Sequence, residues 1–409
     1  MNKTKKALLL FSSLSIFKGI LSRSVPKAFY NLLLSTEKEP VEFLNAYGDF
    51  YSLLSQRGYC DNFAYCLTET ALFDENCFTK ASAGGKADTL PENVISAVVS
   101  DCKTIDFASS ITADDIINDY KYKDEIKEIA DTLPRWNKGK AVEAFLDFDK
   151  DISRLSDFYK SNGCGMFARY RAFIWRDGDI QPVEHPDKIS MESFVGYESQ
   201  RNKVLLNTKS FIEGKTCNNC LLYGDKGTGK SSTVKAIANY FRPQGLRVVE
   251  MPKERLVDFP ILVDKIASLP MKFIIFIDDL SFQKQDQSYT SLKALLEGGL
   301  ASRPKNTLIY ATSNRRHLVK ETWADRDTDD INRRDNMEET LSLSDRFGLA
   351  VCFSSPAKND YVNIVLELAK EKGLEFDEND LAVKAEAFAL SRGGRSPRCA
   401  KQFVESLFC

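Results

Sequence analysis

The stretch Leu221-Leu-Tyr-Gly-Asp-Lys-Gly-Thr-Gly-Lys-Ser-Ser-Thr233 decides how the rest of the sequence is interpreted. It contains Gly224-x-x-x-x-Gly229-Lys230-Ser231, the pattern of a phosphate-binding P-loop. The apolar run that precedes it predicts a buried strand, and apolar residues at helical spacing up to Phe241 predict a helix after it. The alternative is a chance match, but a strand before the loop and a helix after it are the context that the pattern requires.

The residue types in this loop point to a nucleoside triphosphate. Glycines at three positions let the backbone curve so that its N–H groups face a polyphosphate, and the helix that opens near Lys230 adds its positive dipole end. Lys230 is expected to reach the β- and γ-phosphates, and Ser231 to ligate Mg2+. The predicted cofactor-binding residues of the loop are Gly224, Asp225, Lys226, Gly227, Thr228, Gly229, Lys230, Ser231 and Ser232.

Composition bounds the class of protein. The 409 residues predict two or three domains, and 43% hydrophobic with 28% charged residues is ordinary for a globular protein. A net charge of −2 provides no global basic field for nucleic acid or anionic lipid. Ten scattered cysteines fit a reducing cytoplasm better than a disulfide scaffold. The one close pair, Cys217 and Cys220, is interpreted as loop and strand packing, with metal or redox use as the alternative.

The N-terminus allows two interpretations. The first thirty residues carry six Lys or Arg and no acid around an apolar run from Ala7 to Phe17, which resembles a secretory signal. Lys18 interrupts the run and no small-x-small cleavage site follows, so we expect a cytoplasmic helix packed on its own domain. No segment is long enough to span a membrane.

Residues 1–187 are predicted to form a mostly helical domain that serves as a partner or regulatory module. A helix starting near Pro40 has one apolar face, made of Phe43, Tyr47, Phe50 and Leu54. Thr112-Ala-Asp-Asp115 is typical of a helix N-terminus, and this helix is expected to run to Leu133, where Pro134 stops it. Near the end of the region, residues 171–175 look like a strand, followed by a turn at Asp177-Gly178.

Residues 188–354 are predicted to form the nucleotide-binding α/β domain. Lys272-Phe-Ile-Ile-Phe-Ile-Asp278 is typical of a parallel strand buried on both faces, and its carboxyl end is where open α/β sheets bind ligands. Asp278 is expected to hold Mg2+ through water, and Asp279 to position the attacking water. Another strand, residues 307–314, ends in Asn314. Residues 320–340 are rich in acids and are expected to form an exposed insertion.

Residues 355–409 are predicted to form a small helical unit whose last helix contains a local conflict. Ser396 caps this helix and Pro397 begins it, which places Arg398 in the first turn. The helix dipole disfavours a cation there, and a bound phosphate beside Arg398 would resolve the conflict.

These landmarks, in this order, resemble the AAA+ ATPases. Residues 224–231 match Walker A and residues 273–279 match Walker B, and the segment 194–197, Phe-Val-Gly-Tyr, looks like the adenine-side box. The remaining matches are Asn314 to sensor 1, Arg346 to the arginine finger and Arg398 to sensor 2, while Val195 and Tyr197 are the base contacts that the box implies. More closely, residues 194–403 resemble one bacterial AAA+ family that is described only as a domain of unknown function.

The resemblance implies an αβα sandwich with a parallel sheet and a small helical lid, with ATP and Mg2+ as cofactors. It also implies a homo-oligomer in which Arg346 acts in trans on the ATP of a neighbour. Two residues depart from the pattern: Asp279 is one methylene shorter than the usual Glu, and Gln283 stands where the look-alike family usually has Glu. A glutamine cannot act as a general base, and general-base catalysis contributes a factor of roughly 10²–10⁴ to the rate.

Three functions are therefore carried forward from the sequence. The first is an ATPase with catalytic residues Asp279, Asn314, Arg346 and Arg398 and metal ligands Ser231 and Asp278, which remodels an unidentified protein client. The second is an ATP-dependent switch or scaffold with little hydrolysis, which the departures at 279 and 283 favour. The third and weaker one is a DNA-related loader, which rests on the initiator-like segment around Arg346 and the cluster Asn314-Arg-Arg-His317.

Overall fold

The chain forms two compact units, Met1–Arg169 and Tyr170–Cys409. The structure, a computed structural model, describes residues 1–145, 152–281, 292–293, 296, 304–314 and 346–408. The division lies at residue 169 rather than at the predicted 187. Strands β1 (Ala172–Arg176) and β2 (Asp179–Pro182) account for the difference, because β1 pairs in parallel with a strand of the second unit and so brings the β1–β2 hairpin into its sheet.

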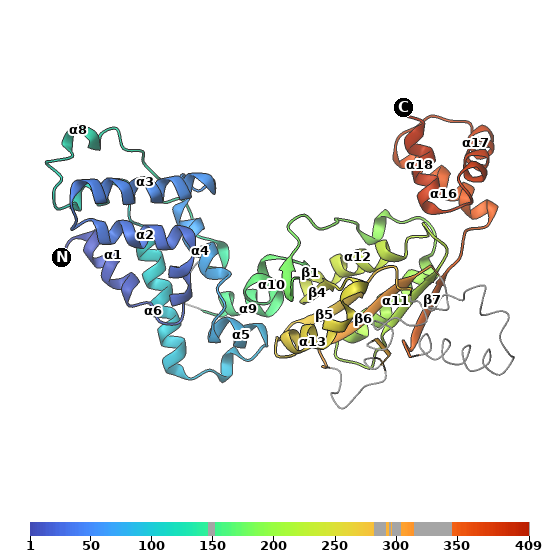
Figure 1. Ribbon diagram of the computed structural model, residues 1–409, viewed down its shortest axis with the longest axis horizontal. Coiled ribbons are helices and arrows are strands. Elements are labelled where there is room, and N and C mark those ends of the chain that lie inside the picture. The colour runs from blue at the N-terminus through green and yellow to red at the C-terminus, as the bar shows by residue number, and fades with distance from the viewer. Residues whose placement is uncertain (146–151, 282–291, 294–295, 297–303, 315–345, 409) are drawn as a thin grey trace. The chain divides into compact units, whose positions relative to one another are not determined.

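The first unit is mostly helical, as predicted (Figure 1). Its α-helices are α1 (Lys3–Ser12), α2 (Ser24–Ser35), α3 (Pro40–Gln56), α4 (Phe63–Leu72), α5 (Cys77–Ala83), α6 (Glu92–Ser109), α7 (Ala113–Asp119), α8 (Lys127–Ala130), α9 (Ser153–Asn162) and α10 (Met166–Arg169). The predicted face of α3 is fully buried, and its aromatic rings pack against other aromatic rings of the same core. The apolar period of the sequence therefore places α3 correctly.

The helix predicted from Thr112 to Leu133 is wrong in its length. Thr112 and Asp115 form the capping box that the sequence indicates, but α7 ends at Asp119. The next residue, Tyr120, leaves the helix because its ring stacks on Phe43 at 4.0 Å and its hydroxyl donates to the Lys38 carbonyl at 3.0 Å. Tertiary packing overrides the local preference for helix here.

The N-terminal apolar run packs within its own unit. Ala7 and Phe11 of α1 are fully buried in the core, as is Phe17 beyond the helix. None of the helices in the described part of the chain combines the length and the apolarity needed to cross a membrane.

The second unit contains a seven-stranded sheet in the order β2-β1-β4-β5-β6-β3-β7 (Figure 1). Its other strands are β3 (Cys220–Gly224), β4 (Leu246–Glu250), β5 (Lys272–Ile277), β6 (Thr307–Ser313) and β7 (Leu349–Phe353). All neighbours pair in parallel except β1 and β2, which form the antiparallel hairpin that the sequence predicts around Asp177-Gly178. Parallel pairing brings the carboxyl ends of β3, β5 and β6 to one edge.

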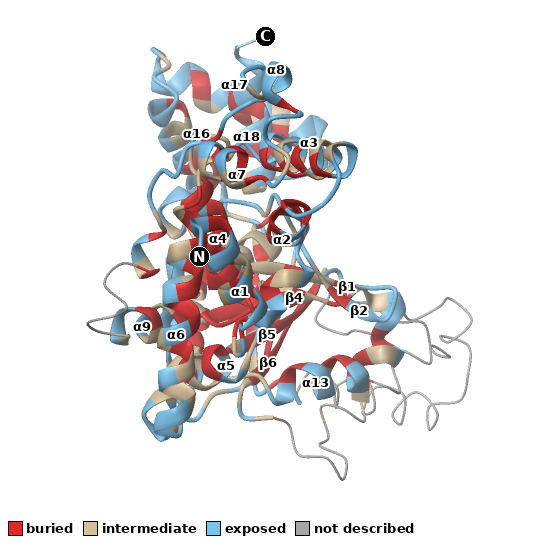
Figure 2. Ribbon diagram, turned by 90° about the vertical axis from the view of Figure 1, so that its left-hand side faces the viewer, coloured by how far each residue is buried: buried red, intermediate tan, exposed pale blue. Residues whose placement is uncertain are grey.

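Helices cover both faces of this sheet and make it an αβα sandwich, as predicted. Helices α11 (Glu198–Ile212) and α12 (Lys230–Phe241) share a core with one face, and α13 (Phe259–Ala267) lies on the other (Figure 1). Strands β5 and β6 are buried along almost their whole length (Figure 2), which is why they read as continuous apolar runs. Cys220 is fully buried in β3 and Cys217 packs against the same core, so the packing interpretation of this pair holds.

Three helices follow β7 and form the predicted lid: α16 (Lys358–Glu371), α17 (Glu378–Ser391) and α18 (Pro397–Ser406). They bury their own small core, against which Val195 also packs. The start of α18 is as predicted, with Pro397 in the first turn and the Ser396 side chain accepting from the Cys399 N–H at 3.1 Å.

Candidate functional site

The P-loop connects β3 to α12, and α12 begins at Lys230 as the sequence predicts. Its three glycines have φ values of 129°, 77° and 90°, which side chains rarely adopt. Gly224 is also sterically required, because a Cβ there would lie 2.2 Å from the Phe353 carbonyl oxygen. The loop is therefore built around positions that only glycine fits.

Lys230 is folded back onto the loop that carries it. Its Nζ donates to the carbonyl oxygens of Gly224 at 2.8 Å and Asp225 at 2.6 Å, and to Asn314 Oδ1 at 3.3 Å. Burial lowers the pKa of this ammonium below its ordinary value. A phosphate would replace neutral carbonyl partners with charged oxygens, which make stronger hydrogen bonds.

Two carboxylates follow β5 at the same edge of the sheet. Asp278 Oδ1 accepts from the Ser231 hydroxyl at 2.6 Å, which joins the two predicted metal ligands. Asp279 Oδ1 accepts from Asn314 Nδ2 at 2.6 Å, which joins two of the predicted catalytic residues. The parallel sheet thus brings together side chains that lie up to 83 positions apart in the sequence.

The donor set suits Mg2+. In the described part of the chain, no three or more His, Cys, Asp or Glu side chains cluster as ligands for a metal. Mg2+ is usually held by one or two carboxylates together with phosphate oxygens and water rather than by a cage made only of protein. Asp278 and Ser231 provide that kind of partial shell beside the P-loop.

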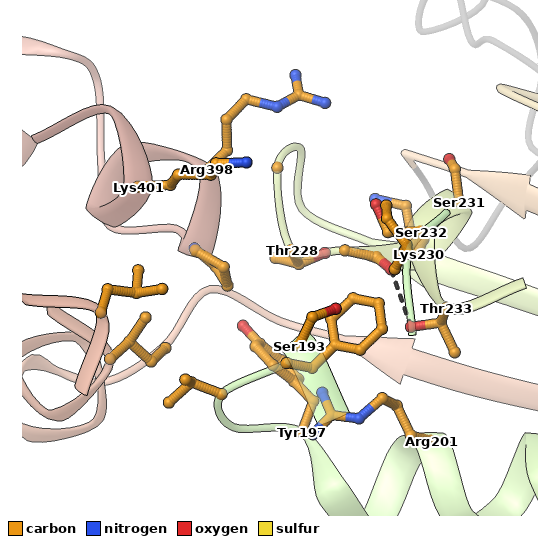
Figure 3. A pocket seen from close by; sticks show the side chains of 18 of the residues that line it. Ser193, Tyr197, Arg201, Thr228, Lys230, Ser231, Ser232, Thr233, Arg398 and Lys401 are labelled. Atoms are coloured by element: carbon orange, nitrogen blue, oxygen red, sulfur yellow. Dashed lines mark hydrogen bonds between the residues drawn. The ribbon is translucent and has the colours of Figure 1, made fainter. Parts of the chain in front are cut away.

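These groups line a cavity of about 790 Å³ between the P-loop, the segment 188–201 and the lid (Figure 3). Arg398 and Lys401 reach it from the lid helix α18, across from Lys230 and Ser231. Seven cations and four acids border this cavity: Lys188, Arg201, Lys226, Lys230, Lys372, Arg398 and Lys401, with Asp278, Asp279, Glu371 and Glu405. This excess of positive charge favours a polyanionic ligand.

The predicted base contacts also line the cavity. Val195 packs against the lid core to which Ile364 and Leu368 of α16 belong, and these apolar residues line the cavity together with Tyr197. Tyr197 has a left-handed backbone with φ 61°, and its hydroxyl donates to the Ser354 carbonyl at 2.6 Å. Burial raises the pKa of Tyr197 to about 12, so the hydroxyl stays protonated as a donor.

Asp225 links the P-loop to the linker that leads into the lid. Its carboxylate accepts from the Ser355 N–H at 2.7 Å, and its own N–H donates to the Phe353 carbonyl at 3.0 Å. The bonds to Ser355 lower the pKa of Asp225. The sequence assigns Asp225 to the ligand, whereas in the structure its carboxylate binds the linker.

Arg398 lies where the lid meets the P-loop. Its backbone N–H donates to the Gly227 carbonyl at 3.1 Å, and its side chain lines the cavity. A cation in the first turn of α18 therefore borders the same cavity as the P-loop, and the phosphate expected beside it stays a prediction.

Arg346 has a different position from the other predicted residues. It is exposed, lies just before β7 and is not one of the described residues that line the cavity. Gln283 and the acidic segment 320–340 lie outside the described residues.

Several residues that line the cavity were not predicted from the sequence, among them Arg201, Thr312 and Lys401. Arg201 is 6% exposed, and its guanidinium lies 5.0 Å from the centre of the Phe194 ring. Thr312 and Lys401 could have been found from spacing. Thr312 is two positions before Asn314 on one face of a strand, and Lys401 is three positions after Arg398 on one face of a helix.

The fold and the site define the class of protein: a P-loop αβα domain with a helical lid, which is the architecture of the AAA+ ATPases. Residues 168–409 match the family described as "Protein of unknown function (DUF815)". The match spans more than half of the chain, and the chain belongs to this family.

Three further proteins are similar to the chain. An AAA-ATPase of Arabidopsis thaliana is 30% identical over 210 residues, which are 48% of this chain and 37% of the plant protein. The Thermotoga maritima RuvB Holliday junction branch migration motor is 16% identical, with a TM-score of 0.36 over 53% of this chain and 63% of its own. AMPPCP-bound DnaA from Aquifex aeolicus is 15% identical, with a TM-score of 0.39 over 55% and 66%. The chain thus spans just over a third of the length of the plant relative.

Proposed function

We propose that this protein binds ATP with Mg2+ and hydrolyses it in a homo-oligomer in order to remodel a protein partner. One observation carries the proposal: Lys230, Ser231, Asp278, Asp279 and Asn314 meet through direct hydrogen bonds at the carboxyl edge of the sheet. A phosphate ligand, a metal shell and an acid for water activation are then within reach of one another.

Ligand binding begins with the P-loop. Its N–H groups and Lys230 bind the β- and γ-phosphates, and Val195 and Tyr197 contact the base. Ser231 and Asp278 hold Mg2+, which when bound neutralises charge on the phosphates. Arg398 provides a cation from the lid and so ties lid closure to the phosphates.

Hydrolysis needs an aligned water molecule. Asp279 accepts a proton from this water as the new P–O bond forms and the bond between the β- and γ-phosphates breaks. Asn314 fixes the Asp279 carboxylate through the 2.6 Å hydrogen bond. Arg346 acts on the ATP of a neighbouring subunit, in agreement with its exposed position outside its own cavity.

Steady-state ATP hydrolysis across a wide range of subunit concentrations, with and without Mg2+, tests this proposal. We expect Mg2+-dependent turnover per subunit that rises with concentration. Arg346→Ala should lower turnover by about 10³–10⁵, as for arginines supplied in trans, and leave ATP binding unchanged. Turnover that is independent of concentration would exclude the role in trans.

Lys230→Ala tests the ligand assignment. It should abolish ATP binding, because it removes the cation that reaches the phosphates. Lys235→Ala is the matched control, since Lys235 lies on the same helix and pairs with Asp187 at 3.9 Å instead of lining this cavity. Equal ATP affinities of the two variants would refute the assignment.

A second candidate function is an ATP-dependent assembly switch with little hydrolysis. The residue at 279 favours it, because Asp279 is one methylene shorter than the usual Glu and so reaches less far toward an attacking water. In this case Asp279→Asn keeps assembly and function in the cell, whereas Lys230→Ala removes both. Tight ATP binding without turnover in the wild type would select the switch.

For either activity, we assign the binding of the partner to the helical unit, residues 1–169. A protein client is favoured over nucleic acid, because the chain has a net charge of −2. Binding to DNA that weakens with rising salt would reverse this preference.

A further inference from the structure

Thr312 binds three consecutive residues at the end of β5. Its hydroxyl donates to Asp278 Oδ1 and accepts from the Asp279 N–H at 3.0 Å. Its carbonyl oxygen accepts from the Leu280 N–H at 2.7 Å. Thr312 itself is 2% exposed in the middle layer of the sandwich, while the two acids that its hydroxyl contacts are exposed at the cavity.

The hydroxyl is fully used by this arrangement. A threonine hydroxyl has one proton to donate and lone pairs to accept with. Here the proton goes to a carboxylate and a lone pair receives a backbone N–H. Valine has nearly the same shape but would remove this partner from both the carboxylate of Asp278 and the N–H of Asp279.

The backbone of Asp279 is the feature that this hydroxyl supports. Asp279 has φ 50°, one of three positive values among the described non-glycine residues. This left-handed region is unfavourable for most side chains but is tolerated by Asp and Asn. This turn directs the Asp279 carboxylate to Asn314. The Asp279 N–H, at the centre of the turn, donates its hydrogen bond to the Thr312 hydroxyl.

We propose that Thr312 is a positioning residue for hydrolysis, one that sets both acids through a single hydroxyl. It orients the metal-binding carboxylate of Asp278, and it maintains the left-handed turn that places the carboxylate of Asp279. Thr312 would keep its bond to Asp278 if Ser231 exchanged its own bond to this carboxylate for a bound Mg2+. This role deepens the proposed function and rests on it.

The test compares Thr312→Val, which removes the hydroxyl, with Thr312→Ser, which keeps it. Thr307→Val is the matched control, because Thr307 is 1% exposed on the same strand and its hydroxyl bonds to Asn306 instead of either acid. For each protein we would measure kcat, KM, the ATP affinity with and without Mg2+, and the melting temperature.

Thr312→Val is expected to lower kcat by roughly tenfold to a hundredfold, the loss that follows from removing a hydrogen bond to a charged group. It should also remove most of the gain in ATP affinity that Mg2+ gives, so the KM measured with Mg2+ should rise while the affinity without Mg2+ stays near wild type. Thr312→Ser should restore kcat, and Thr307→Val should leave kcat unchanged even if it melts earlier.

Each other outcome decides against some part of this reasoning. If Thr312→Val matches the wild type, or loses no more kcat than Thr307→Val, the positioning role is overturned and the ATPase proposal stands. If the wild type binds ATP without turnover, the role of Thr312 in hydrolysis is overturned together with the ATPase proposal, whereas ATP binding stands. If the wild type binds no ATP, the proposed function fails and the role of Thr312 fails with it.

Discussion

A methyl group on Gly227 would lie between the P-loop and the lid. A Cβ at this position would be 2.9 Å from Ser396 Oγ and 3.1 Å from Arg398 Cβ, both in the first turn or cap of α18. The backbone at Gly227 also has φ 77°, where an L-residue is strained. Gly227→Ala therefore has two separable costs, one in the loop itself and one in its contact with the lid.

Both costs have an expected size. The left-handed backbone costs about 1–2 kcal/mol for alanine, which lowers the melting temperature of a unit of this size by about 2–8 °C. Displacing α18 breaks the hydrogen bond from the Arg398 N–H to the Gly227 carbonyl, worth about 0.5–1.5 kcal/mol. Because the lid lines the cavity, the loss of this hydrogen bond should appear as a roughly two- to twelvefold loss of ATP affinity.

Gly245→Ala provides the matched control. Gly245 has φ 85°, and a Cβ there meets no described heavy atom within 4 Å, so alanine has the strain without the lid contact. Thermal unfolding and titration calorimetry with ATP should show similar losses of stability but a loss of affinity only in Gly227→Ala. Equal ATP affinities of the two variants would refute a lid that bears on the P-loop through this contact.

Three further predictions concern the lid and its linker, residues 354–357. Glu386 accepts two hydrogen bonds from Arg395, at 2.9 and 2.7 Å, and this pairing lowers the pKa of Glu386 below its ordinary 4.5. The stabilisation from the pair is therefore present above pH 4.5 and is lost as the pH falls through the lower pKa of the folded protein. Glu386→Gln should accordingly flatten the acid side of a curve of melting temperature against pH. Tyr197→Phe removes the donor to the linker and should weaken ATP binding by about two- to tenfold in calorimetry, and an unchanged affinity would contradict this. Asp225→Ala should melt earlier than Asp225→Asn, which keeps an acceptor oxygen for the linker N–H; identical melting curves would show that this bond is unimportant.

The sequence predicts those parts of the site that depend on neighbouring residues. The P-loop, the helix after it and the start of α18 all follow from short patterns, because glycine, serine and proline act on the backbone within a few positions. The apolar run of β5 likewise indicates a strand buried on both faces. Each of these elements is present in the structure.

Other features depend on partners far along the chain. The β1–β2 hairpin was recognised, but its place beside β4 required knowledge of the sheet order. The end of α7 is set by the ring of Phe43, 77 positions before Tyr120. At the left-handed turn, the Asp279 N–H donates to Thr312 in another strand, a contact that a pattern around Asp279 alone could not predict.

Two hydrogen bonds hold the linker before the lid. The Tyr197 hydroxyl donates to the Ser354 carbonyl, and the Asp225 carboxylate accepts from the Ser355 N–H. Tyr197 stands at the apolar end of the cavity and Asp225 at the phosphate-binding loop. The two residues that flank the start of the lid are therefore each bonded to a different end of the cavity, so a change at either end reaches the lid through one hydrogen bond.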